Sequence, residues 1–293
     1  MRARRACLSV PAAPAPMPEK GRSIAVDEVV LDLEDSVPVA AKDEARETLV
    51  EVLGRDGWAP RSVAVRINGL DSPWWETDVG ELVPRAGGRI DSIVVPKVED
   101  PDQLRRLDAK LTEHEGEARE RPIALEALIE TAAGLRAIDP IAAATPRLEA
   151  LILGPADLAA SLGLPDSDPE ERDEALGFAR STLLVAARAA RVAAIDGPFL
   201  RIDDEDGLRR SAARARALGY DGKWALHPRQ IEPLERVFTP GPDEIERARA
   251  VLAALAGDGR GAVALGGEMV DEASRKRAEA ILARAEAGSG PAA

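Results

Sequence analysis

The sequence alternates short apolar segments with longer segments of helical periodicity, and this alternation occurs eight times. The apolar segments are rich in Val, Ile and Leu and lack polar alternation, which is typical of parallel strands buried on both faces. They span residues 7–10, 29–32, 63–67, 92–96, 123–128, 151–154, 192–195 and 223–226. Helical patterns between them, such as 40–53, 104–115 and 169–191, predict parallel crossovers. Eight strand–helix units predict a TIM (β/α)8 barrel, a fold of about 250 residues.

A doubly wound open sheet is the structural alternative to the barrel. However, no Gly-rich phosphate-binding fingerprint follows the first strand, and eight units exceed the usual count of that fold. We therefore predict a catalytic barrel domain over residues 1–240, followed by a C-terminal helical extension over residues 241–293. The extension shows helical patterns at 243–256 and 268–287, a Gly-rich hinge at 257–261 and an end of disordered composition. We expect it to act as a lid over the mouth of its own or a neighbouring barrel.

Charge and composition exclude several classes of protein. The formal net charge of -13 argues against a nucleic-acid-binding protein, because phosphate backbones require a basic face. No apolar run approaches the roughly 20 residues of a membrane helix. The single cysteine, Cys7, has no internal disulfide partner, and we expect a cytoplasmic location.

Side chains capable of chemistry follow the ends of the predicted strands. They are Glu34, Asp35, Arg66, Lys97, Glu126, Glu130, Asp157, Asp196 and His227. Because active sites of TIM barrels lie at the carboxyl ends of the strands, we expect these groups to converge on one mouth.

Two of these groups, Glu130 and Asp157, follow neighbouring strands and predict a metal site. Two carboxylates that leave other positions open for water and substrate suit Mg²⁺, or Mn²⁺, better than zinc, for which His and Cys ligands are lacking. The alternative interpretation is that each carboxylate caps a helix or pairs with an arginine.

Arg66 ends an apolar strand, where an unpaired guanidinium is costly. It therefore binds either a substrate carboxylate or an internal partner such as Glu34 or Asp35. The acidic run at 32–35 either orders the water molecules of a bound metal or holds this arginine.

These residues lie within segments that resemble the HpcH/HpaI aldolase and citrate lyase β-subunit family, most closely its malyl-CoA and β-methylmalyl-CoA lyases. The resemblance spans nearly the whole chain. Its segments include LDLEDSVP (31–38), VRIN (65–68), VVPK (94–97), LIET (128–131), LGPADL (153–158), GYDGKWALHP (219–228) and EMVDEASR (268–275), together with 5–11, 19–20, 42–46 and 194–198.

The resemblance implies that Glu130 and Asp157 bind Mg²⁺, that Arg66 holds an α-keto acid and that Asp271 acts as the acid/base. It also implies a homotrimer or hexamer in which the C-terminal lid supplies Asp271 to a neighbouring subunit. The implied reaction is reversible cleavage of a 3-hydroxydicarboxylyl-CoA, malyl-CoA or β-methylmalyl-CoA, to acetyl-CoA or propionyl-CoA and glyoxylate.

Three alternatives remain open at the sequence level: citramalyl-CoA cleavage, hydrolysis of the thioester after condensation, and a weakly active acyl-CoA-binding paralogue or lyase-complex subunit. The chain also departs from the family pattern at residues 14–18, where a Pro-rich stretch replaces a basic residue expected to contact coenzyme A. Lys20 and Arg22 are the candidates for binding the CoA phosphates, with surface exposure as the alternative for both.

Overall fold

Eight parallel strands form a closed barrel in the computed structural model, which describes residues 2–116, 121–256 and 262–289. The strands pair in sequence order, and β8 pairs with β1 to close the barrel. They are β1 (Ala6–Pro11), β2 (Glu28–Asp32), β3 (Ser62–Arg66), β4 (Ser92–Val95), β5 (Ala124–Ile129), β6 (Leu148–Leu153), β7 (Ala193–Asp196) and β8 (Gly222–Ala225). The predicted TIM barrel is confirmed, with strand bounds close to those expected from the sequence.

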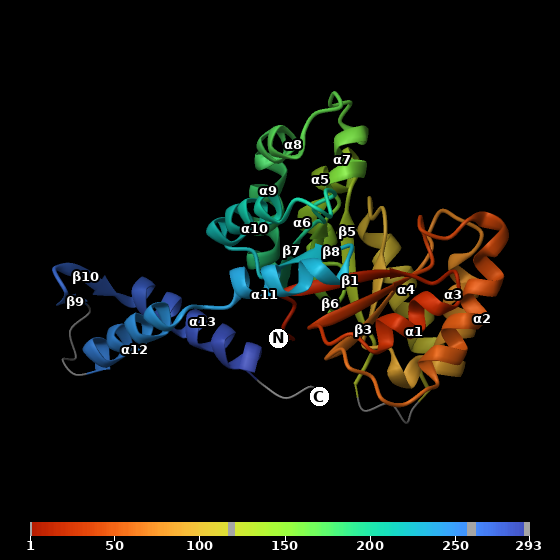
Figure 1. Ribbon diagram of the computed structural model, residues 1–293, viewed down its shortest axis with the longest axis horizontal. Coiled ribbons are helices and arrows are strands. Elements are labelled where there is room, and N and C mark those ends of the chain that lie inside the picture. Colours follow the sequence, from red (N-terminus) through yellow and green to blue (C-terminus); the bar gives the residue numbers. More distant parts are fainter. Residues whose placement is uncertain (1, 117–120, 257–261, 290–293) are drawn as a thin grey trace.

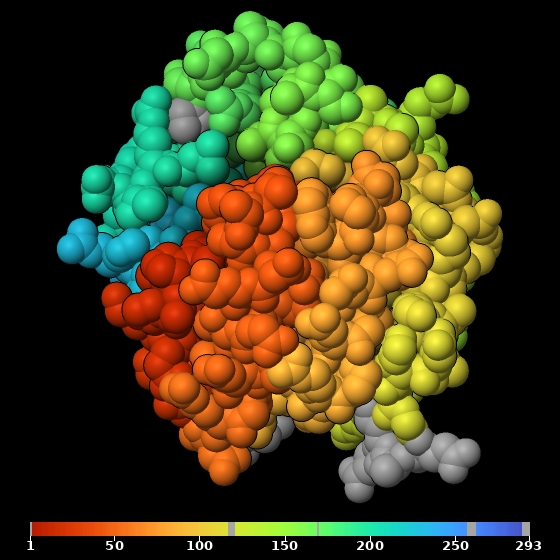
Figure 2. Space-filling view, turned by 90° about the vertical axis from the view of Figure 1, so that its right-hand side faces the viewer, coloured from red at the N-terminus to blue at the C-terminus, as the bar shows by residue number. Residues whose placement is uncertain are grey.

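Helices surround the barrel (Figure 1), and Figure 2 shows α1 to α4 side by side on one face. The helices that follow the strands are α1 (Pro16–Arg22), α2 (Lys42–Leu53), α3 (Trp75–Ala86), α4 (Pro101–His114), α5 (Ala132–Arg136), α6 (Ile138–Ala142), α7 (Pro155–Ser161), α8 (Pro169–Ala175), α9 (Gly177–Ala190), α10 (Glu205–Leu218) and α11 (Ile231–Phe238). The prediction of one continuous helix over 169–191 was wrong. The buried Leu176, at φ -91° and ψ 8°, leaves helical geometry and separates α8 from α9.

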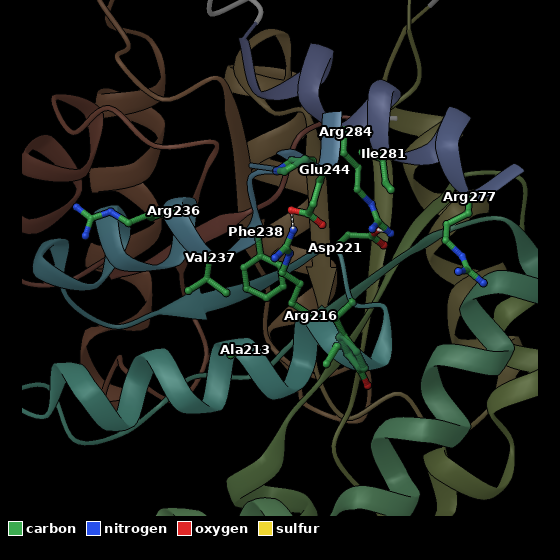
Figure 3. Close-up of a pocket in the computed structure, with 13 residues that line it drawn as sticks. Ala213, Arg216, Asp221, Arg236, Val237, Phe238, Glu244, Arg277, Ile281 and Arg284 are labelled. Atoms are coloured by element: carbon green, nitrogen blue, oxygen red, sulfur yellow. Dashed lines mark hydrogen bonds and ion pairs between the residues drawn. The ribbon is translucent and has the colours of Figure 1, made fainter. Parts of the chain in front are cut away.

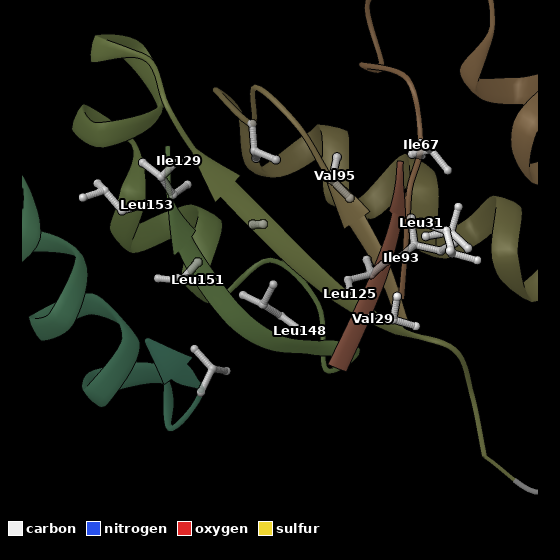
Figure 4. Close-up of a cluster of buried hydrophobic side chains, with 14 of the residues drawn as sticks. Val29, Leu31, Ile67, Ile93, Val95, Leu125, Ile129, Leu148, Leu151 and Leu153 are labelled. Atoms are coloured by element: carbon white, nitrogen blue, oxygen red, sulfur yellow. The ribbon is translucent and has the colours of Figure 1, made fainter. Parts of the chain in front are cut away.

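The strands are apolar on both faces because each face is buried. Outward side chains such as Val29, Leu31, Ile93 and Leu151 pack in the main core (Figure 4). A second cluster combines alternate positions of several strands: Cys7, Val30, Ala64, Val94, Leu128, Ala150, Ile152, Ala193, Ile195 and Trp224. This burial on both faces removes the polar alternation of half-exposed strands and explains the continuous apolar runs in the sequence.

A buried ionic cluster joins the amino-terminal ends of several strands. The Arg4 guanidinium donates to Glu28 at 2.9 Å and to Glu126 at 3.0 Å, and all three side chains are fully buried. Burial, together with the charge of Glu126, raises the pKa of Glu28 to about 8. The folded state therefore favours the protonated form of Glu28 more than the unfolded state does.

Replacing Glu28 with glutamine is expected to stabilise the protein above pH 8, by about 1 kcal/mol or more. The folded state of the parent binds more protons than the unfolded state between the ordinary glutamate pKa of 4.5 and about 8, so its free energy of unfolding falls as pH rises through that window. Urea denaturation at pH 6 and 8.5 measures this slope. The half-exposed Glu149, which also contacts Arg4 at 3.0 Å, provides the control variant Glu149→Gln. If the free energy of unfolding of Glu28→Gln depended on pH as strongly as that of the parent, the raised pKa of Glu28 would be contradicted.

The C-terminal segment protrudes from one side of the barrel (Figure 1). It comprises α12 (Pro242–Ala256), β9 (Ala262–Leu265), β10 (Glu268–Asp271) and α13 (Glu272–Ser289). The prediction of a single helix over 268–287 was wrong, because residues 268–271 pair with β9 as an antiparallel hairpin. Gly266 and Gly267 both take positive φ, which suits a tight two-residue turn.

The segment contacts the barrel through α13, whose Arg284 donates to Asp221 at 3.1 Å. The expected hinge at 257–261 and the last four residues of the expected disordered end lie outside the described residues. No helix in the described part of the chain is long and apolar enough to cross a membrane.

Candidate active site

Glu130 and Asp157 line one cavity of about 180 Å³ at the carboxyl ends of the strands. Glu130 follows β5 directly, and Asp157 lies in the first turn of α7, which follows β6. Gly154 allows the close approach of the two connections, because a Cβ atom there would lie 2.4 Å from Glu130 Cβ. Asp35 and Arg66 line the same cavity. The structure therefore brings together four of the side chains predicted for the site.

The electrostatics of this cavity favour a cation. Burial, together with the negative charges of Asp157 and Glu34, raises the pKa of Glu130 to about 8. A divalent cation between Glu130 and Asp157 would relieve this repulsion and replace the lost hydration. No cluster of three or more His, Cys, Asp or Glu side chains suited to a metal occurs among the described residues. Glu130 and Asp157 offer two carboxylates to such a cation, and hard oxygen ligands of this kind suit Mg²⁺.

Arg66, at the end of β3, is held from two sides. Its guanidinium makes two hydrogen bonds of 2.7 Å to the Asp32 carboxylate and an ion pair of 3.1 Å to Glu34. Burial lowers the pKa of Arg66, but the hydrogen bonds and charges of these carboxylates outweigh it and raise the pKa above its ordinary value. The Trp224 ring lies 5.6 Å from the guanidinium carbon. Internal pairing therefore exists, and Arg66 still lines the cavity.

Lys97 contacts both Glu130 and the acidic residues that follow β2. It follows β4 at φ +50°, a left-handed conformation that is uncommon for residues other than glycine. Its N–H donates to Glu130 Oε1 at 2.9 Å, while its ammonium contacts Glu34 at 2.5 Å and Asp35 at 3.4 Å. Strained backbone is common at functional sites, where the surrounding structure maintains it.

Replacing Lys97 with glycine is expected to give a protein about 1 kcal/mol more stable than Lys97→Ala, because glycine has no Cβ to oppose positive φ. Both variants are expected to lose activity, since Glu34 and Asp35 lose their cation. Urea denaturation of the two variants measures the effect of the backbone conformation on stability. Turnover measurements show the effect of losing the ammonium on activity. Equal stability of the two variants would show that the left-handed backbone is not strained.

The structure does not bring Lys20, Arg22 or Asp271 to this cavity. Lys20 is exposed on α1, and the Arg22 guanidinium contacts Glu19 at 3.0 Å and the carbonyl of Gly57 at 3.1 Å. Asp271 is exposed at the end of β10, in the protruding segment, where its carboxylate accepts a hydrogen bond from Ser274 N at 3.0 Å.

Three other side chains expected at the mouth do not line the cavity and make their contacts elsewhere, which corrects that expectation. Glu126 points into the barrel below Glu130 and binds Arg4 and Ser92. Asp196 points outward, where it accepts from Arg180 at 3.0 Å and pairs with Lys223. His227 caps the turn that follows it, because its Nδ1 accepts from Arg229 N at 3.2 Å.

Sequence reasoning missed the role of Gly154 and the double contact of Lys97. A glycine at the end of a buried strand is a signal of close backbone approach, so Gly154 was detectable. No sequence signal indicates the positive φ of Lys97.

A larger hollow of about 500 Å³ lies between α10, α11 and α13 (Figure 3). Two of its four arginines pair with acids within the hollow, Arg216 with Glu244 at 2.5 Å and Arg284 with Asp221 at 3.1 Å. None of the predicted site residues lines it. The smaller cavity at the strand ends is therefore the candidate active site.

Comparison with known proteins agrees with this geometry. Residues 5–228 match the family described as HpcH/HpaI aldolase/citrate lyase. The chain is 38% identical to an L-malyl-CoA/β-methylmalyl-CoA lyase of Cereibacter sphaeroides, over 92% of this chain and 90% of that protein. It is 36% identical to a malyl-CoA/β-methylmalyl-CoA/citramalyl-CoA lyase of Chloroflexus aurantiacus, over 88% and 80% of the two chains. The CitE protein of Mycobacterium tuberculosis, solved with magnesium, acetoacetate and coenzyme A, superposes with a TM-score of 0.80 at 33% identity, over 97% and 98% of the chains.

Proposed function

The chain belongs to the HpcH/HpaI aldolase/citrate lyase family and is a carbon–carbon lyase, and from this premise we propose that it cleaves malyl-CoA or β-methylmalyl-CoA with Mg²⁺ as cofactor. The products are acetyl-CoA or propionyl-CoA and glyoxylate. The observation that carries the proposal is the juxtaposition of Glu130, Asp157 and Arg66 around one cavity in a chain 38% identical to a lyase of that name.

Cleavage requires stabilisation of charge on both fragments. The 3-hydroxyl gives its proton to a carboxylate of the site or to water, its C–O bond becomes the carbonyl of the oxo acid, and the electron pair of the breaking C2–C3 bond passes to the thioester as an enolate. Bound Mg²⁺ would polarise the oxygens of the oxo acid. Arg66 offers a guanidinium matched to the oxo-acid carboxylate, and Asp32 and Glu34 hold that guanidinium in place.

Coenzyme A lies outside the cavity in this proposal, because about 180 Å³ suits a small oxo acid and is too little for a nucleotide. We propose Lys20 as a phosphate contact, since its side chain is exposed. Arg22 is the weaker candidate because Glu19 already pairs with it.

We propose that residues 1–240 are the catalytic domain and that residues 241–293 form a lid. Asp271 acts in this scheme as the acid that protonates the enolate, and as the base in condensation. Because Asp271 is exposed outside the cavity of its own chain, we propose a homotrimer or hexamer in which it enters a neighbour's site. The single cysteine supports a cytoplasmic location for this assembly.

Mixing two inactive variants, Asp271→Ala and Arg66→Met, is expected to restore activity. In a mixed oligomer with equal subunits, about a quarter of sites combine an intact Arg66 with a neighbour's intact Asp271. Turnover after co-refolding measures this recovery, and each variant alone is the control. Absence of recovery in oligomers shown to be mixed would place Asp271 in its own chain's site.

The substrate is tested by comparing kcat/KM for malyl-CoA, β-methylmalyl-CoA and citramalyl-CoA. Citramalyl-CoA is the second candidate because the Chloroflexus relative is named for all three thioesters. One methyl group changes binding by only about 1–3 kcal/mol, so the ratio of kcat/KM values decides. Pyruvate release from citramalyl-CoA at the highest kcat/KM would replace the proposed substrate.

A further inference from the structure

Lys42 is a buried lysine with an unusual set of partners. It is the first residue of α2, is only 6% exposed, and its ammonium donates to the carbonyls of Leu33 and Glu34 at 2.9 and 3.1 Å. A third hydrogen bond of 2.5 Å reaches Asn68 Oδ1, and the Trp74 ring lies 5.2 Å away. All three acceptors are neutral, and within the described ranges the ammonium makes no ion pair of 4 Å or less with a carboxylate. Burying an ammonium costs free energy, which these three hydrogen bonds offset without the help of a direct ion pair.

The hydrogen bonds of Lys42 join the segment that follows β2 to the segment that follows β3. These two segments flank Arg66, the proposed contact of the oxo acid. Leu33 and Glu34 lead out of β2, and Asn68 leads out of β3, two residues after Arg66. The Glu34 carboxylate in turn contacts Arg66 at 3.1 Å and Lys97 at 2.5 Å. A continuous series of contacts therefore runs from the Lys42 ammonium, through the backbone of Glu34, to the guanidinium at the cavity.

We propose that Lys42 is a positioning residue, which fixes the Glu34 carboxylate and thereby the orientation in which Arg66 meets the oxo acid. It touches neither substrate nor metal. The inference rests on the proposed function for the identity of the oxo acid, glyoxylate.

Arg46 provides a matched control within the same helix. Like Lys42 it is a buried cation of α2, and it belongs to the same network, since its Nε donates to Asp78 at 3.0 Å and Asp78 accepts from Asn68 at 2.7 Å. Unlike Lys42, Arg46 makes no hydrogen bond to the Glu34 backbone among the described residues. Lys42→Met and Arg46→Met thus share the loss of a buried cation and differ in the contact to Glu34.

The experiment is a double-mutant cycle on glyoxylate affinity, measured by calorimetry in Mg²⁺ with the full-length protein. Lys42→Met is expected to weaken glyoxylate binding about tenfold, as is typical when a group that orients a ligand-binding residue is lost. Arg46→Met should change it less than about twofold at comparable loss of stability. In the Glu34→Gln background, Lys42→Met should add almost nothing, because its effect passes through the missing carboxylate.

Two results would overturn the inference: independent, multiplying effects of Lys42→Met and Glu34→Gln, or an equal loss of affinity in Arg46→Met. Glyoxylate binding needs no turnover, so a parent that binds glyoxylate but cleaves no thioester would contradict the proposed function alone. If the parent binds no glyoxylate, amide hydrogen exchange of residues 33–37 decides. Faster exchange in Lys42→Met than in Arg46→Met supports the positioning role, and equal exchange refutes it.

Discussion

Glu130→Gln is expected to lower the rate of metal-dependent cleavage about a thousandfold or more, because polarisation by a metal contributes several kcal/mol to catalysis. Glutamine keeps the shape of the side chain but offers one neutral oxygen to a cation. The metal-free protein should at the same time be as stable as the parent or more so, since burial and Asp157 oppose the charge of Glu130. Turnover and urea denaturation on the same preparation measure the two effects.

The control for this prediction is Glu99→Gln. Glu99 is an exposed glutamate just after β4, and the same chemical change there should alter neither activity nor stability by more than about 0.5 kcal/mol. Asp157→Asn should resemble Glu130→Gln. A Glu130→Gln protein that retains full Mg²⁺-dependent turnover would show that the metal is bound elsewhere.

Arg66→Met is expected to lose both activity and stability. It leaves the buried carboxylates of Asp32 and Glu34 without the guanidinium, and breaking a buried pair typically costs about 3–5 kcal/mol. The oxo acid also loses its proposed guanidinium partner, which lowers kcat/KM by a further factor of about a hundred or more. Arg66→Lys keeps the charge without the planar fork and should recover stability better than activity.

The double variant Arg66→Met/Asp32→Asn separates the two effects. Removing the unpaired carboxylate should restore much of the stability, whereas the activity should remain lost. Thermal unfolding and steady-state kinetics on the parent, Arg66→Met and the double variant test whether stability returns without activity. If activity returned together with stability, Arg66 would be a structural residue with no role at the substrate.

The barrel was predictable because its strands are buried on both faces, so each appears as a continuous apolar run. The same property hid the direction of individual side chains. Glu126 and Asp196 both lie near strand ends, yet one points into the barrel and the other toward α9, because successive strand residues point to opposite faces. Strand ends can be located from the sequence in such runs, but without polar alternation nothing in the pattern fixes which residues face inward.

The Glu130 and Asp157 pair was predictable because Glu130 follows β5 directly, Asp157 lies in the first helical turn after β6, and adjacent parallel strands end at the same rim. The β-hairpin that ends at Asp271 was not, since Met269 and Val270 continue a helical pattern and only the Gly266-Gly267 pair signals a turn. The contacts of Lys42 depend on tertiary structure, because its three acceptors come from the ends of two separate strands.

The most direct test of the assigned chemistry is quantification of products by mass spectrometry after the purified protein meets malyl-CoA, with Mg²⁺ or with EDTA. We expect equal amounts of acetyl-CoA and glyoxylate with Mg²⁺, none with EDTA, and full recovery when excess Mg²⁺ is restored. Cleavage that persists unchanged in EDTA, or absence of cleavage of malyl-CoA, β-methylmalyl-CoA and citramalyl-CoA by folded protein in Mg²⁺, would contradict the assigned chemistry.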